Sequence, residues 1–294
     1  MERVMPRLAW HIEEPRVGQS YPNFYAAQLA SKFVKVVLSG VGGDELFGGY
    51  PWRYYRAVRN DSFEDYVDKY YAYWQRLMPH ETLRRLLRPI EAQIKDVDTR
   101  NIFRDVFTRH APELTRPEDY VNHSLFLEAS TFLHGLLVVE DKLSMAHSLE
   151  TRVPFLDNDL IEFAMRLPVR CKLANLAEMI EMSENEPFDK PGAYFQRTRD
   201  GKLLLRQVMA RHIPSEIANG EKKGFSAPDA SWFKGESIDY VRRELLGERA
   251  RMYAFLDRKV VGELVDEHLS GRKNSRLLIW SFLIFEWWLR KFLP

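Results

Sequence analysis

The segment of the sequence with the most chemical potential is glycine-rich and reads Ser39-Gly-Val-Gly-Gly-Asp-Glu-Leu-Phe-Gly-Gly-Tyr50. Glycines that follow a strand let backbone N–H groups approach the phosphates of a nucleotide closely. Asp44 and Glu45 add carboxylate oxygens, which suit a Mg²⁺ ion held by phosphates. The segment is not a Walker loop, since no Gly-Lys-Ser/Thr follows it. By itself, the pattern is equally typical of a glycine turn that leads into a helix capped by a carboxylate.

A second charged segment reads EDKLSMAHSLETRVPFLD and runs from Glu140 to Asp157. Its Val-Pro-Phe-Leu portion is apolar and is predicted to be buried. This would carry three charged side chains toward the interior, namely Glu150, Arg152 and Asp157. Buried charges must be paired, so these residues alone favour a structural ion network over a catalytic site.

A third segment, Glu221-Lys-Lys-Gly-Phe-Ser226, places two lysines before a glycine. Lysines in such a turn can face a phosphate. The pattern alone is more typical of a basic surface turn.

Local elements must position these segments. The β-branched run Val34–Leu38 predicts one buried strand, and the residues from Tyr21 to Phe33 before it show a helical pattern. A helix, a buried strand and a glycine loop form half of a parallel α/β unit. A strand needs neighbours to satisfy its backbone, and the sequence offers few others. We therefore expect its neighbours to belong to a larger domain or another polypeptide, and its apolar flanks to lie partly uncovered.

After Tyr50 the pattern is mainly helical. From Val121 to Leu137, apolar residues recur at helical spacing on one face. The same reasoning predicts helices over Phe63–Met78, Thr82–Leu87, Leu160–Arg166, Leu203–His212 and Ser275–Phe292. The last of these is expected to be a buried helix, because its apolar run is too short to span a bilayer. The polar stretch Ser183–Gly192 predicts a surface loop.

Composition narrows the functional class. Of the 294 residues, 45% are hydrophobic and 29% are charged, which is typical of a globular protein in water. The 43 basic and 42 acidic residues leave a net charge of +1, so no net field attracts nucleic acid or an anionic membrane. Cys171 is the single cysteine, which excludes an intramolecular disulfide and favours a reducing, cytoplasmic location.

Taken together, the three segments resemble the synthetase domain of the glutamine-hydrolysing asparagine synthetase family. The matching motifs are LSGVGGDELFGGY, EDKLSMAHSLETRVPFLD and EKKGFSAPDASWF, and WHIEEP near the start also fits. Their order and spacing cover nearly the whole chain. The resemblance implies an α/β fold of the adenine-nucleotide alpha-hydrolase-like (ATP pyrophosphatase) type that is incomplete at its N-terminus. Residues 1–50 would be the remnant of the nucleotide-binding core, and residues 51–294 would form a mainly helical portion of the same domain.

Members of this family use ATP and Mg²⁺ to adenylate a carboxylate, by default that of aspartate, and ammonia then displaces AMP to leave an amide. The resemblance implies that Asp44 helps to hold Mg²⁺ and that Lys222 is the catalytic cation that stabilises negative charge during adenylation. The residues implied to contact ATP are Ser39, Gly40, Val41, Gly42 and Gly43. The residues implied to support the site are Glu45, Asp141, Glu150, Arg152 and Asp157.

Three features depart from the family pattern. We find no Ser-Gly-Gly-Leu-Asp-Ser type of pyrophosphate loop, and Glu2 stands where the glutaminase nucleophile, a cysteine, would be exposed. Position 41, often acidic in the family, is Val41, which cannot accept a proton. We therefore expect a partial enzyme with little activity by itself, and one arrangement places the glutaminase and pyrophosphate loop on a separate polypeptide. The alternatives are a non-catalytic homologue that binds a nucleotide or a partner, and a helical interaction module.

Overall fold

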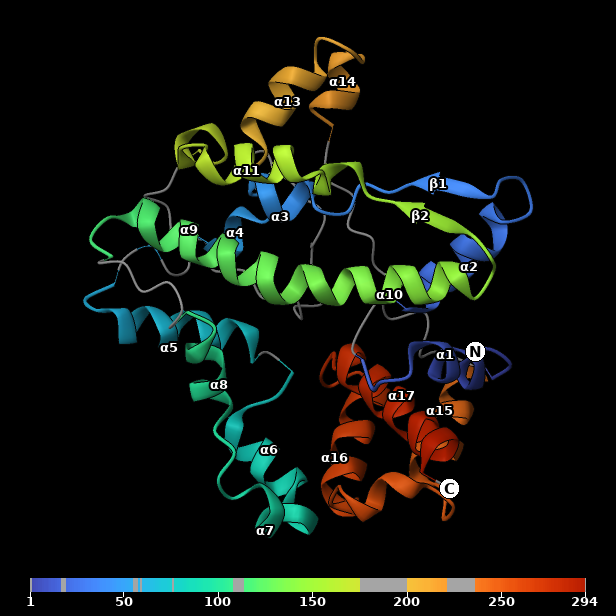
Figure 1. The fold of residues 1–294 in the computed structure, drawn as a ribbon. Coiled ribbons are helices and arrows are strands. Elements are labelled where there is room, and N and C mark those ends of the chain that lie inside the picture. Colours follow the sequence, from blue (N-terminus) through green and yellow to red (C-terminus); the bar gives the residue numbers. More distant parts are fainter. Residues whose placement is uncertain are drawn as a thin grey trace.

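The computed structural model describes residues 2–16, 20–54, 58, 60–75, 77–107, 114–174, 200–220 and 236–293. These residues form a mainly helical molecule with a small parallel sheet (Figure 1), which is compatible with the predicted fold class. The longer elements, in chain order, are α1 (Met5–Ile12), α2 (Ser20–Ala30), β1 (Val36–Leu38), α3 (Gly43–Phe47), α4 (Pro51–Tyr54), α5 (Phe63–Trp74), α6 (His80–Leu86), α7 (Glu91–Ile94), α8 (Thr99–Asp105), α9 (Pro117–Leu127), α10 (Leu133–Met145), β2 (Glu150–Arg152), α11 (Asn158–Arg166), α13 (Leu203–Met209), α14 (Ser215–Ala218), α15 (Glu236–Leu246), α16 (Arg258–Leu269) and α17 (Arg276–Phe292). Shorter helical turns are η2 (Arg88–Ile90), η5 (Pro154–Leu156), η6 (Val169–Cys171) and η8 (Arg251–Ala254).

A long helical rod crosses the middle of the molecule and consists of α9, a π-helical segment η4 (Glu128–Phe132) and α10 (Figure 1). Asp119 helps to start the rod by accepting the backbone N–H of Arg116 at 3.0 Å. The helix predicted from Val121 to Leu137 is confirmed, but its π turn was not predicted. A π turn holds an extra residue, so the helix face after it is rotated by about 100° relative to an uninterrupted helix.

The predicted strand is present as β1, but it is shorter than expected and it is not buried. Val34 is 45% exposed and Leu38 is 73% exposed. The expectation of a buried strand is therefore wrong, whereas the expectation of partly uncovered apolar flanks is confirmed. A parallel sheet ordinarily has both faces covered by helices. In the part of the chain that the structure describes, the face of β1 that carries Val36 and Leu38 is uncovered.

The neighbour of β1 within the described residues is β2, which runs parallel to it with Val36 opposite Glu150 and Leu38 opposite Arg152. This second strand was not predicted, because Glu-Thr-Arg is short and charged at both ends. Residues two apart in a strand share a face, and both charged side chains of β2 face solvent. The α10 helix precedes β2 and supplies the crossover that a parallel pair requires.

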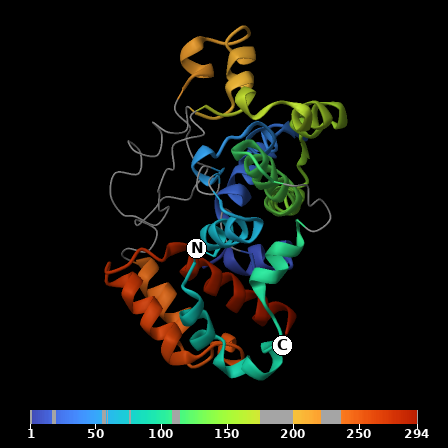
Figure 2. The ribbon, with the colours of Figure 1, turned by 90° about the vertical axis from the view of Figure 1, so that its left-hand side faces the viewer.

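An extensive hydrophobic core joins the two ends of the chain. Figures 1 and 2 show α1 beside the C-terminal helices, and the Trp10 and Phe292 rings stack at 5.8 Å. The indole N–H of Trp288 donates to the carbonyl of Glu13 at 2.9 Å. The predicted final helix is confirmed as α17, and Trp280 within it is buried. No helix among the described residues is both long and apolar enough to cross a membrane.

The other helices predicted from periodicity are present with shifted ends. They are α5, which ends at Trp74 rather than Met78, α6, α11 and α13. The predicted loop Ser183–Gly192 lies outside the described residues.

Candidate functional site

The glycine loop, residues 39–43, follows the end of β1 directly. The Ser39 N–H donates to the carbonyl of Arg152 at 2.8 Å, so the ladder of the sheet continues into the loop. The Ser39 hydroxyl accepts the Val41 N–H at 3.3 Å, and the Gly43 N–H donates to the Gly40 carbonyl at 3.3 Å. Gly40 is exposed and has open space around it, whereas Gly42 and Gly43 are buried. The loop therefore has one open side and one packed side.

Two apolar side chains that follow β2 form the packed side. A Cβ added to Gly42 would lie 2.5 Å from Cδ2 of Leu156, and one added to Gly43 would lie 3.3 Å from Cε2 of Phe155. Gly42 also has φ of 95°, which residues with a side chain rarely adopt. The Val-Pro-Phe-Leu segment thus supports the loop through its apolar residues, and glycine is the residue that leaves room for them.

Asp44, at the start of α3, forms an ion pair with a lysine that the sequence analysis did not single out. Its Oδ1 lies 2.8 Å from Nζ of Lys202, and the two side chains are 24% and 26% exposed. Lys202 has φ of 58°, a left-handed conformation that costs a non-glycine residue about 1–2 kcal/mol. Its N–H donates to the Phe47 carbonyl at 3.1 Å, which ties this strained residue to the end of α3. Residues with a strained backbone cluster at functional sites. The signal in the sequence that could have identified Lys202 is the Gly201-Lys202 pair just before a helix.

Glu45 points inward and is buried, with 2% of its surface exposed. One oxygen accepts the Gly42 N–H at 3.2 Å and the other accepts the Tyr50 hydroxyl at 3.0 Å. Burial, and then the carboxylates of Asp44 and Glu45, raise the pKa of Tyr50 far above its ordinary value. Its hydroxyl therefore stays protonated and can donate to Glu45. Because both of its oxygens accept hydrogen bonds within the protein, Glu45 supports the loop conformation.

The charged residues of the second segment do not form the interior ion network that the sequence predicted. Glu150 and Arg152 pair with each other at 2.8 Å, but both are more than half exposed. Asp157 is exposed and caps α11, where its Oδ1 accepts the N–H groups of Asp159 and Leu160. The expectation of burial is wrong because Phe155 and Leu156 pack on the loop while the strand and cap residues on either side face solvent.

Asp141 lies exposed on α10. Within the described residues, no hydrogen bond or ion pair joins it to the glycine loop. Lys222 lies outside the described residues.

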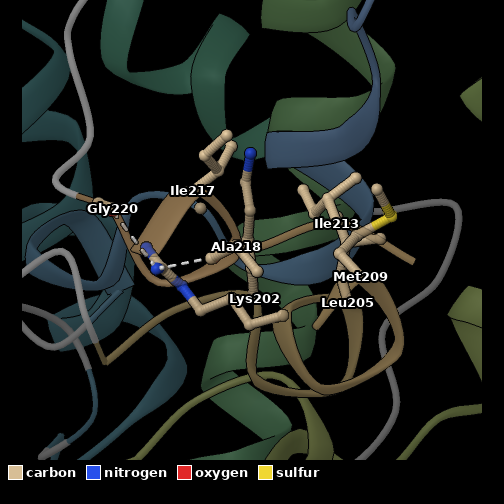
Figure 3. Close-up of a pocket in the computed structure, with 9 residues that line it drawn as sticks. Lys202, Leu205, Met209, Ile213, Ile217, Ala218 and Gly220 are labelled. Atoms are coloured by element: carbon tan, nitrogen blue, oxygen red, sulfur yellow. Dashed lines mark hydrogen bonds between the residues drawn. The ribbon is translucent and has the colours of Figure 1, made fainter. Parts of the chain in front are cut away.

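A cavity of about 250 Å³ opens beside the Asp44–Lys202 pair, between α13 and α14 (Figure 3). Its lining residues are Gly49, Lys202, Leu205, Arg206, Met209, Ile213, Ile217, Ala218 and Gly220. Arg206 donates to the carbonyls of Ala218 and Gly220, at 3.3 and 3.4 Å. In Figure 3 the extended side chain of Lys202 carries its ammonium away from Leu205 and Met209. The cavity lining is thus largely aliphatic, with two cationic residues, Lys202 and Arg206.

The carboxylates beside the glycine loop could contribute one protein ligand to a Mg²⁺ ion. No group of three or more His, Cys, Asp or Glu side chains that could hold a metal occurs within the described residues. Asp44 presents a partly exposed carboxylate, whereas both oxygens of Glu45 are engaged. Because Mg²⁺ often takes one or two protein carboxylates and completes its shell with phosphates and water, the residues fit an ion that arrives with a nucleotide.

Comparison with known proteins identifies the family of the chain. The family model for asparagine synthase matches residues 1–290. The chain belongs to the asparagine synthase family. It is 26% identical to the asparagine synthetase [glutamine-hydrolyzing] 1 of Bacillus subtilis, over 97% of this chain and 45% of that protein. A relative from Mycobacterium bovis is 28% identical over 97% of this chain and 44% of its own length.

A further B. subtilis relative, asparagine synthetase [glutamine-hydrolyzing] 3, is 24% identical over 90% of this chain and 39% of its own length. The chain therefore spans less than half the length of these relatives. Membership in the asparagine synthase family applies to residues 1–290, which include the glycine loop, the Asp44–Lys202 pair and the cavity.

Proposed function

We propose that this chain is the synthetase part of an ATP-dependent, amide-forming ligase. In the first step, a carboxylate oxygen of the substrate attacks the α-phosphorus of ATP, and pyrophosphate leaves. In the second step, ammonia attacks the acyl carbon, AMP leaves with the C–O bonding electrons, and the nitrogen loses a proton to give the amide. Family membership over residues 1–290 is the observation that carries this proposal.

The site supports specific roles for its residues. The open side of the loop, at Ser39, Gly40 and Val41, would face the nucleotide, with Gly42 and Gly43 holding the backbone in place. Asp44 would be the carboxylate ligand of a Mg²⁺ ion, whose chemistry when bound is to neutralise charge on the phosphates.

Two lysines would supply positive charge to the same step. Lys202 is next to Asp44, at 2.8 Å, and would contact phosphate oxygens. Lys222 is proposed on the family motif alone to stabilise the charge that builds during adenylation. Cations placed before the reaction stabilise such charge most effectively, because no reorganisation is needed as it develops.

Aspartate is the first substrate to test, since the named relatives are asparagine synthetases. Val41 cannot act as a base in the second step, so the proton of the attacking nitrogen must leave to water or to another group. Ammonia could be free or come from glutamine hydrolysis in another part of the assembly, and assays with an ammonium salt and with glutamine separate these sources.

The test is ATP–pyrophosphate exchange, with and without aspartate, on this chain and on a version of it extended upstream. We expect aspartate-dependent exchange in the longer protein, and D44N should reduce it about 100-fold, the usual cost of losing a transition-state contact. The free energy of unfolding of D44N should change by less than about 1 kcal/mol, because the Asp44–Lys202 pair is partly exposed. The control D266N removes an exposed carboxylate on α16 and should leave exchange unchanged.

Absence of exchange with aspartate and other carboxylic acids, in a folded protein that binds ATP, would overturn the ligase proposal. That result would favour the alternative, a non-catalytic homologue that acts as a nucleotide-binding module.

A further inference from the structure

A fully buried carboxylate lies in the π turn of the central rod. The Glu128 side chain has no exposed surface. Its Oε1 accepts the hydroxyl of Tyr70 at 2.7 Å, and its Oε2 accepts the hydroxyl of Tyr54 at 3.3 Å. Nη1 of Arg53 lies 3.5 Å from the same Oε2, and Arg53 is also buried. Two opposite charges have therefore been removed from water, at a desolvation cost that their pairing must offset.

Aromatic rings hold the guanidinium of Arg53 in a defined place. Its Cζ lies 3.8 Å from the ring centroid of Tyr50, 4.7 Å from that of Phe132 and 5.2 Å from that of Trp74. The attraction between a cation and the face of an aromatic ring is strongest where water is excluded. Arg53 thus links Glu128 in the π turn to Tyr50, the residue between α3 and α4.

Tyr50 continues this chain of contacts into the glycine loop. Its hydroxyl donates to Glu45 at 3.0 Å, and the other oxygen of Glu45 accepts the N–H of Gly42 at 3.2 Å. The Tyr50 ring also meets Trp52 and Phe132 edge to face. The ring therefore cannot shift without disturbing both the buried guanidinium and the hydrogen bond that caps the loop.

We propose that the buried Glu128–Arg53 pair is a positioning device that holds Tyr50, and through Tyr50 and Glu45 fixes the conformation of the glycine loop. None of these side chains needs to touch a substrate for this role. The proposal rests on the proposed function in one respect, that the loop binds a nucleotide, but the link between the pair and the loop is independent of it.

Stability alone does not account for this arrangement. Apolar residues of similar volume commonly replace a buried ion pair with no loss of stability, or with a gain. The π turn that carries Glu128 is itself a rare feature, and such turns are frequently found at functional sites. The buried ion pair and the π turn are instead suited to selecting one conformation of the segment that they contact. That segment is connected to Gly42 through Tyr50 and Glu45.

The fold offers a matched pair of variants for testing the link. Tyr70 and Tyr66 lie one turn apart on α5, and both are completely buried. The hydroxyl of Tyr70 bonds to Glu128, whereas that of Tyr66 bonds to the hydroxyl of Ser124 at 3.0 Å. Tyr70→Phe and Tyr66→Phe therefore remove the same buried group, but only the former removes a hydrogen bond to the carboxylate of the positioning device.

The measurement is native-state hydrogen exchange of residues 39–46, followed by mass spectrometry without nucleotide, on the wild type and four variants. Glu128→Gln replaces one acceptor oxygen by a donor NH₂ and removes the negative charge that lies beside Arg53, so exchange in this segment should rise at least tenfold. Tyr50→Phe, which removes the hydroxyl that reaches Glu45, should have a similar effect. Y70F should raise exchange at least threefold, and Y66F should leave it within twofold of the wild type.

The proposal is overturned if Glu128→Gln folds and leaves loop exchange within twofold of the wild type, or if Y66F raises it as much as Y70F. If Glu128→Gln does not fold, the comparison of Y70F with Y66F decides, since each removes a single oxygen. Because no nucleotide is present, a failure of ATP–pyrophosphate exchange would leave this result readable, and the two proposals can fail separately.

Discussion

Lys172 is among the largest side chains that the fold buries, with 2% of its surface exposed. Lys172 lies next to the end of α3, because a Cβ added to Gly48 would be 3.5 Å from the Cβ of Lys172. The backbone carbonyl of Lys172 accepts the Leu203 N–H. Within the described residues, no ion pair or side-chain hydrogen bond of Lys172 is present. Burial lowers the pKa of Lys172 from 10.5 to about 8, so its charged form is disfavoured in the folded protein.

This shift has a direct consequence for stability. Below pH 8, Lys172 is protonated in both the folded and unfolded states, and the folded state bears the cost of a buried charge. The shift of 10.5 to about 8 corresponds to about 3 kcal/mol at pH 7. As pH rises from 8 toward 10.5, the folded state has already lost the proton while the unfolded state still holds it, so stability increases. The remaining cost at pH 9.5 is about 1.5 kcal/mol.

Lys172→Met removes the charge and keeps a flexible side chain of similar volume. We expect this variant to be more stable than the wild type by about 3 kcal/mol at pH 7, and the gain should shrink by about half at pH 9.5. Chemical denaturation followed by tryptophan fluorescence, at several pH values between these two, measures the difference. Methionine adds apolar burial of its own, but this contribution does not depend on pH, so the slope with pH isolates the charge.

The control is Lys259→Met, which removes an exposed ammonium on α16 and should change stability by less than about 0.5 kcal/mol at each pH. If Lys172→Met were less stable than the wild type at pH 7, or if the difference did not vary with pH, the reasoning about the cost of burying the Lys172 charge would be refuted.

Four further substitutions test the site. Gly49→Ala places a Cβ against Asp44 and should cost about 2 kcal/mol of unfolding free energy, whereas Gly40→Ala, with open space around it, should cost less than about 1 kcal/mol; thermal denaturation of both separates a steric requirement from a general preference for glycine. Arg152→Ala breaks an exposed ion pair and should lower the free energy of unfolding by less than about 0.5 kcal/mol. A loss above about 2 kcal/mol in a denaturant titration would indicate that Arg152 is buried. Asp157→Ala removes a helix cap and should cost about 1 kcal/mol, so a loss no greater than that of R152A would argue against the cap.

Much of the helical structure follows from short-range pattern. The apolar spacing from Ser275 onward predicts α17, and the spacing from Phe63 predicts α5, because residues three and four apart share a helix face whatever the rest of the chain does. The glycine loop could also be predicted from the sequence, because glycine is required where the backbone turns and packs closely against other residues. These features depend on neighbours in the chain.

The candidate site was predictable only in part. The sequence located the glycine loop and the family, which is confirmed over residues 1–290. Asp44 as a metal ligand and Lys222 as a catalytic residue stay predictions. Lys202 was missed because its pairing with Asp44 is made by folding. The two residues are far apart in the sequence, and nothing near Lys202 points to Asp44.

Charge burial is the property that the tertiary structure decided. Sequence reasoning placed Glu150 and Arg152 inside because apolar residues follow them, yet both face solvent. It gave no sign that Glu128 and Lys172 would be buried. Pairing of β1 with β2 was likewise hidden. The physical reason is common to all of them: periodicity reports which residues share a face of one element, whereas burial and strand pairing depend on which other elements cover that face, and these come from far away in the chain.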